Sequence, residues 1–93
     1  KKLVPLQKEY LKTKTAYQKD TKNKKNRDAF LKAATVYGHE TMVSPELPTR
    51  VKYRDALRVY REVLAIDPKH PVAREEHDLI VSIYKQMGRP VPK

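Results

Sequence analysis

The sequence predicts an all-α fold in which four antiparallel helices pack as stacked helical hairpins within one domain, residues 1–93. Three observations support this fold class. Apolar residues recur at helical spacing in four segments, the links between those segments are short and rich in Asp, Asn and Pro, and the chain matches itself at an offset of 47 residues. A charged fraction of 34% and only two glycines also fit solvated helices better than tight β-hairpins.

The first two helices are expected at about residues 5–19 and 24–42. Pro5 suits a first helical turn, where its missing N–H has no helical acceptor to lose. The segment from Asp20 to Asn23 ends the first helix, because Asp and Asn favour turns and caps. The predicted buried stripes are Leu6, Tyr10, Thr13 and Tyr17 in the first helix, and Phe30, Ala33, Ala34, Val36, Tyr37 and Thr41 in the second.

The third and fourth helices are expected at about residues 49–66 and 72–87. The prolines at 45 and 48 stop the second helix, and Asp67-Pro68 separates the last two. Gly88 supplies a C-terminal stop. The predicted buried stripes are Tyr53, Ala56, Leu57, Tyr60, Val63 and Leu64 in the third helix, and Ala73, His77, Ile80, Tyr84 and Met87 in the fourth.

The internal match pairs Asp20 with Asp67 and Tyr37 with Tyr84, with similar residues between them. An internal match of this length indicates stacked supersecondary units. Such units usually present a surface to a partner and carry no chemistry of their own. The pattern therefore favours a binding protein over an enzyme.

The second half of the chain resembles a tetratricopeptide repeat. The residues that carry the resemblance are Tyr53, Ala56, Tyr60 and Val63, then the Asp67-Pro68 turn, and finally Tyr84 and Gly88. Residues 51–89 match well and residues 16–43 match weakly. The unit here is longer than the family's repeat of about 34 residues, and the extra length lies around residues 39–49. The resemblance implies a right-handed array of helix pairs that binds protein segments.

On this basis we expect a non-enzymatic protein–protein interaction module, or a scaffold or accessory subunit of a larger assembly, that binds a protein partner or associates with itself. Its partner-binding groove would lie between the second and fourth helices. The family's peptide-carboxylate clamp needs Lys and Asn on this face, and here no Asn accompanies Lys32 and Lys85. The expected groove residues are Asp28, Lys32, Thr35, His39, Glu75, Asp78, Ser82 and Lys85.

The loop between the second and third helices has two interpretations. It combines exposed apolar side chains with two prolines, a composition that suits docking to a partner. Alternatively, Leu47 folds back and covers the open end of the hairpin. The residues of this protruding loop are Met42, Val43, Pro45, Leu47 and Pro48.

The net charge of +10 is concentrated near the start of the chain, where residues 1–27 contain ten Lys or Arg and two acids. The alternative function is therefore electrostatic binding of nucleic acid or an anionic membrane through residues 1–27. Tyr10 and Tyr17 would then be available to stack on bases. The predicted basic patch consists of Lys12, Lys19, Lys22, Lys24, Lys25 and Arg27.

Sequence patterns for chemistry are weak, and we expect no enzyme, metal or cofactor. The chain lacks cysteine, its three histidines are far apart in sequence, and no nucleophile–base motif is recognisable. His77 is expected to be a packing residue. No apolar run reaches the roughly 18 residues of a membrane span. The compartment stays open: the chain begins at Lys1 without Met, so a processed or fragmentary product, cytoplasmic or exported, is expected.

Overall fold

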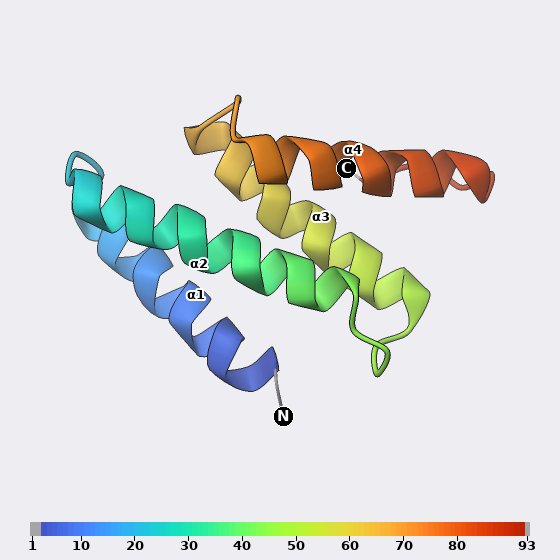
Figure 1. Cartoon of the computed structure of the whole chain (residues 1–93), viewed down its shortest axis with the longest axis horizontal. Coiled ribbons are helices and arrows are strands. Elements are labelled where there is room, and N and C mark those ends of the chain that lie inside the picture. Colours follow the sequence, from blue (N-terminus) through green and yellow to red (C-terminus); the bar gives the residue numbers. More distant parts are fainter. Residues whose placement is uncertain (1–2, 93) are drawn as a thin grey trace.

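The computed structural model describes residues 3–92 and confirms the all-α fold class. Four helices, α1 (Leu3–Lys19), α2 (Lys24–Met42), α3 (Thr49–Ile66) and α4 (Pro71–Gln86), account for most of this range, and no strand occurs within it. Each helix runs antiparallel to the one before it (Figure 1). The expected bounds were close, since α1 begins two residues earlier than expected and α4 is displaced by one.

The helix α2 lies at the centre of the molecule. It packs against α1 on one side and α3 on the other, whereas α4 packs mainly on α3 and meets α2 only locally. The core is continuous across all four helices. Its buried apolar side chains are those of Tyr10, Phe30, Leu31, Ala34, Tyr37, Met42, Ala56, Leu57, Val59, Tyr60, Val63, Ala73, Ile80 and Tyr84.

The helices α2 and α3 approach each other closely at Gly38. A Cβ atom placed there would lie 3.0 Å from the ring of Tyr60, which is itself fully buried. Of the two adjacent alanines in the predicted buried stripe of α2, Ala34 is fully buried and Ala33 is only half-buried.

Two of the expected core residues are on the surface. Val36 is 41% exposed and Met87 is 43% exposed. Met87 lies just beyond the last helical residue, Gln86, where the chain turns away through Gly88 at a positive φ of 69°. His77 is only half-buried, at the edge of the stripe that Ala73, Ile80 and Tyr84 bury.

The helix ends recur at the same 47-residue offset as the sequence match. Helices α1 and α3 end at Lys19 and Ile66, and α2 and α4 begin at Lys24 and Pro71. The N-cap side chains are also 47 residues apart: Asn23 accepts from the N–H of residue 26, and His70 accepts from the N–H of residue 73. The two turns therefore share one hydrogen-bonding plan, even though only one of them contains proline.

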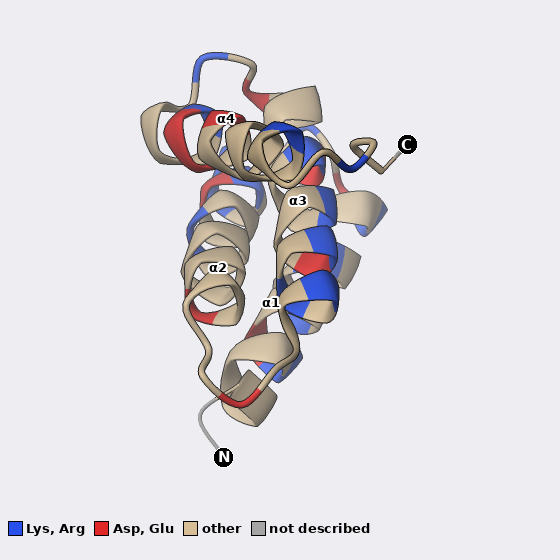
Figure 2. Ribbon diagram, turned by 90° about the vertical axis from the view of Figure 1, so that its right-hand side faces the viewer, with Lys and Arg blue, Asp and Glu red and all other residues tan. Residues whose placement is uncertain are grey.

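Basic residues lie along α3 as well as α1. Each of these helices carries three more basic than acidic residues, whereas α4 carries one more acidic than basic residue. Figure 2 shows Lys and Arg along one flank of α3, where Arg50, Arg54 and Arg58 are exposed. The positive charge is thus not confined to the first quarter of the chain.

Candidate functional site

The candidate site is the inner face, which we define as the adjacent exposed sides of α2 and α4. His39 of α2 and Glu76 of α4 mark where the two helices meet, with 2.8 Å between His39 Nδ1 and Glu76 Oε2. At about 100° per residue, Val72, Leu79 and Ile83 lie within about 60° of Glu76 around α4. Val36 lies about 60° from His39 around α2. These apolar residues therefore border the same face.

The inner face exposes apolar side chains that the sequence analysis did not assign to a groove. Val36, Val72 and Leu79 are 41%, 45% and 49% exposed. Val72 and Leu79 are seven residues apart along α4, a spacing that places two residues on the same side of a helix. The residues predicted for the groove were mainly charged or polar, and these apolar side chains were not among them.

The expected groove residues divide into two sets. Most are exposed, and Thr35 is half-buried. Asp28, Lys32, Thr35 and His39 lie on the exposed side of α2, and Glu75 flanks Glu76 on α4. Asp78 and Lys85 are about 160° to 180° from Glu76 around α4, so they face away from α2. With Ser82, they line a separate hollow beside His77 and Val81. Glu75, Asp78, Ser82 and Lys85 span only about 80° around α4, so they form one exposed stripe, which begins about 100° from Glu76. A partner-binding groove at these residues stays a prediction.

A single carboxylate connects three helices behind the inner face. The hydroxyl of Tyr60 (α3) donates to Glu76 Oε1 (α4), and His39 (α2) contacts both carboxylate oxygens at 2.8 and 3.2 Å. The Glu76 side chain is 16% exposed and Tyr60 is fully buried. Burial, together with the bond to Glu76, raises the pKa of Tyr60 well above its usual value, so the phenol remains a donor.

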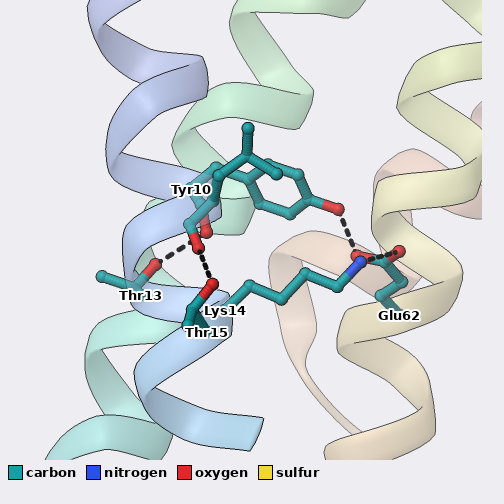
Figure 3. Close-up of polar contacts among 6 residues, drawn as sticks. Tyr10, Thr13, Lys14, Thr15 and Glu62 are labelled. Carbon is teal, nitrogen blue, oxygen red and sulfur yellow. Dashed lines mark hydrogen bonds and ion pairs between the residues drawn. The ribbon is translucent and has the colours of Figure 1, made fainter.

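A second carboxylate, Glu62 of α3, connects α3 to α1 (Figure 3). It accepts from the hydroxyl of Tyr10, and it lies 2.9 Å from Lys14 Nζ. Burial and this hydrogen bond raise the pKa of Tyr10. Sequence reasoning missed both Glu62 and Glu76, since each looks like an ordinary charge beside a helix stripe.

Tyr10 is not available for stacking on nucleic-acid bases. Its ring is 4% exposed and packs inside the core, with centroid distances of 5.0 Å to Tyr37 and 6.0 Å to Phe30. Tyr17 is half-buried, and its ring stacks on Phe30 at 5.7 Å. The structure therefore contradicts a stacking role for Tyr10, because its ring is buried in the core. Tyr17 has one described ring stack, on Phe30, and is half-buried, so its stacking role stays a prediction.

The loop between α2 and α3 folds back more than its composition indicated. Met42 is the last residue of α2 and is buried, and Ser44 is buried beside it. Lys52 Nζ lies 3.4 Å from the carbonyl of Ser44, which ties the loop to α3. Leu47 is half-buried, Pro45 and Pro48 are exposed, and Val43 is the exposed large apolar residue of this segment. Met42 therefore does not belong to an exposed docking surface.

The predicted basic patch gathers around the turn between α1 and α2. Lys19, Lys22, Lys24 and Lys25 are all exposed there, and Lys12 is exposed nearer the middle of α1. Arg27 is partly covered and contacts Asp28 at 3.3 Å. This patch lies at one end of the helix stack (Figure 1).

The histidines have local partners instead of forming one site. His70 caps α4, His39 contacts Glu76, and His77 Nδ1 lies 3.0 Å from Asp78. The hydrogen bond from His77, with help from Arg74, lowers the pKa of Asp78. Among residues 3–92, no three His, Cys, Asp or Glu side chains are grouped to hold a metal ion.

No helix among residues 3–92 is long and apolar enough to cross a membrane.

Comparison with known proteins does not assign the chain to a family. No protein-family model matches the sequence, and neither a curated protein nor a solved structure matches it significantly.

Proposed function

We propose that this chain is a non-enzymatic protein-interaction module, related in design to tetratricopeptide repeats, whose inner face docks a segment of another protein. The observation that carries the proposal is the group of exposed apolar side chains Val36, Val72 and Leu79 beside the α2–α4 contact. Apolar residues surrounded by polar ones are typical of protein-docking surfaces. The shared plan of the two turns supports the repeat-like design.

The charges around the inner face define the partner's chemistry. On α2, Lys25 and Lys32 lie on the same side as Val36, whereas α4 offers Glu75. A complementary segment would carry apolar anchors for the centre, acidic side chains toward α2 and a basic side chain toward α4. Such complementarity sets orientation and association rate more than affinity.

The Glu76 contacts would prepare the inner face for binding. Because the carboxylate is bonded to Tyr60 and contacts His39, it holds α4 in place relative to α2 and α3. A surface that is already rigid loses less conformational entropy when a partner docks. In this account Glu76 acts through the placement of helices and does not itself contact the partner.

The test compares proteins captured from a lysate by the wild-type chain and by variants with an altered inner face. The test variants are Val72→Glu and Leu79→Glu, and the matched control is Leu11→Glu, which also replaces an exposed apolar residue, 50% exposed, but on α1. Melting curves first establish that all three variants fold. We expect one set of proteins to bind the wild type and the control and to be lost from both test variants. Equal capture by all four chains would contradict the proposal.

A second candidate function is electrostatic binding of a polyanion by the basic turn. The supporting observation is that Lys19, Lys22, Lys24 and Lys25 are all exposed within one short segment. Phosphate contacts make binding steeply salt-dependent. Changing Lys22, Lys24 and Lys25 to Glu should abolish binding of single- or double-stranded nucleic acid, and unchanged affinity would exclude this candidate.

A further inference from the structure

An open apolar hollow lies between α1 and α2. Its apolar lining comes from Leu6, Ala29, Ala33 and Val36, with Glu9 and Lys32 at the rim, and its volume is about 310 Å³. No described element covers it. Because Val36 also borders the inner face, the hollow lies at the edge of that face toward α1.

The corresponding position in the second half of the molecule is filled by α2. Adding 47 to the lining residues gives positions on α3 and α4, and several of these are covered. Ala56 and Ile80 are fully buried and Glu76 contacts His39 of α2, whereas Leu79, the counterpart of Lys32, is exposed. At the open position, by contrast, Glu9, the counterpart of Ala56, is exposed. In the second half of the molecule, therefore, α2 packs at the position that corresponds to this hollow.

The helix α4 has the matching open surface. On α2, the side that meets α3 carries Leu31, Ala34 and Gly38, all of which are buried. The residues 47 positions later, Asp78, Val81 and Lys85, instead line an open hollow of about 400 Å³ with His77 and Ser82. On α4, therefore, Asp78 and Lys85 are exposed, and Val81 is half-buried at the edge of the core.

We propose that copies of this chain associate head to tail, with α4 of one copy packing on α1 and α2 of the next. The contact would repeat, between copies, the packing of α2 on α3 within one chain. The template is the contact between Gly38 and Tyr60, which corresponds to Lys85 of one copy opposite Thr13 of the next.

The charges and apolar groups fit this arrangement. In an antiparallel contact between α4 of one copy and α1 of the next, residue numbers rise along one helix as they fall along the other. Starting from Lys85 opposite Thr13, Val81 therefore lies opposite Tyr17. The same alignment places Lys85 one helical turn from Glu9, within reach of an ion pair. The Lys85–Glu9 pair is the feature that makes a second copy, with its own Glu9, the occupant. The α4 surface of the proposed contact is separate from the inner face, because Val81 and Leu79 lie on opposite sides of α4. On α2 the two surfaces share Val36 at their common edge.

The proposed contact uses two different surfaces, so it continues beyond a dimer unless the assembly closes into a ring. The net charge of +10 on each copy opposes association and makes the contact weak. Sedimentation equilibrium should therefore show an average mass that rises with concentration up to about 1 mM, the range in which millimolar contacts are populated.

Variants identify the surfaces. Val81→Arg should reduce association, and Glu9→Lys and Lys85→Glu should each do so alone. An equimolar mixture of the last two should associate again through alternating copies, since each contact between the two different variants pairs opposite charges, and the double variant should behave like the wild type. The controls Leu79→Glu and Leu11→Glu should associate normally, because neither residue lies on a proposed contact surface.

Three results would overturn the proposal: a wild-type monomer at about 1 mM, a mass that stops at a symmetric dimer, or a mixture of Glu9→Lys and Lys85→Glu that stays as weakly associated as its components. A monomer that still captures partners through Val72 and Leu79 would leave the proposed function intact. The two proposals therefore fail separately.

Discussion

Replacing Glu76 with Ala tests whether one carboxylate holds three helices together. In the folded chain this carboxylate accepts a hydrogen bond from Tyr60, contacts His39 at 2.8 Å, and is only 16% exposed. The substitution removes both contacts and leaves the Tyr60 hydroxyl without its acceptor in the core. We therefore expect a large loss of stability from a residue that resembles any other surface acid in the sequence.

The magnitude follows from the two contacts. A hydrogen bond to a charged group contributes about 1.5 to 3 kcal/mol, and a buried hydroxyl without a partner costs about 1 to 3 kcal/mol. The His39 side chain is 47% exposed, so solvent screening limits its contribution to less than about 1 kcal/mol. A net loss of about 3 kcal/mol in the free energy of unfolding is expected, equivalent to a melting temperature lower by about 12 to 24 °C.

The assay is urea unfolding followed by circular dichroism, with Glu75→Ala as the matched control. Glu75 is exposed on the same helix turn, and its replacement should change the free energy of unfolding by less than about 0.5 kcal/mol. Tyr60→Phe completes a double-mutant cycle, in which we expect a coupling of at least about 1 kcal/mol between Tyr60 and Glu76. Additive effects, or equal losses for Glu75→Ala and Glu76→Ala, would refute the reasoning.

The other predictions concern pH, packing and the core. Because the pKa values of Tyr10 and Tyr60 are raised in the folded chain, both stay protonated there when the unfolded chain ionises above about pH 10. For each of the two tyrosines, the free energy of unfolding should therefore fall by about 1.4 kcal/mol per pH unit above pH 10. Urea titrations between pH 9 and 11 measure this, and Tyr60→Phe should weaken the slope; an unchanged slope would show that Tyr60 does not contribute. Gly38→Val should cost about 1 to 3 kcal/mol, because its side chain would overlap the Tyr60 ring; a melting temperature equal to wild type would disprove the close approach. Leu57→Ala, at a site 1% exposed, should cost about 2 to 5 kcal/mol in urea unfolding, and a loss below 1 kcal/mol would mean that the core is looser than described.

The fold class and the helix bounds could be predicted because they depend on local signals. Asn23, Asp67 and Pro71 act on the backbone next to them, and the stripe of Ala56, Leu57, Tyr60 and Val63 repeats at the helical period. These signals do not require knowledge of which helix packs on which. The positions of Val36 and Met87 were harder, because both fit a stripe by spacing, and only the placement of α1 and the end of α4 leave them exposed.

The candidate site was predicted less well because it depends on contacts between distant segments. Glu76 is defined by Tyr60, 16 residues away, and by His39, 37 residues away. Periodicity indicates which side of α4 is buried, but it does not show which exposed edge faces α2. For that reason Asp78, Ser82 and Lys85 were placed in the groove, whereas Val72 and Leu79 were not.

The central claim is that the inner face of α2 and α4 docks another protein through its exposed apolar side chains. Quantitative mass spectrometry of proteins captured by the wild-type chain and by Leu79→Glu, with Leu11→Glu as control, tests this claim most directly. The account predicts partners that depend on Leu79 and not on Leu11. Identical capture by the three chains would contradict it.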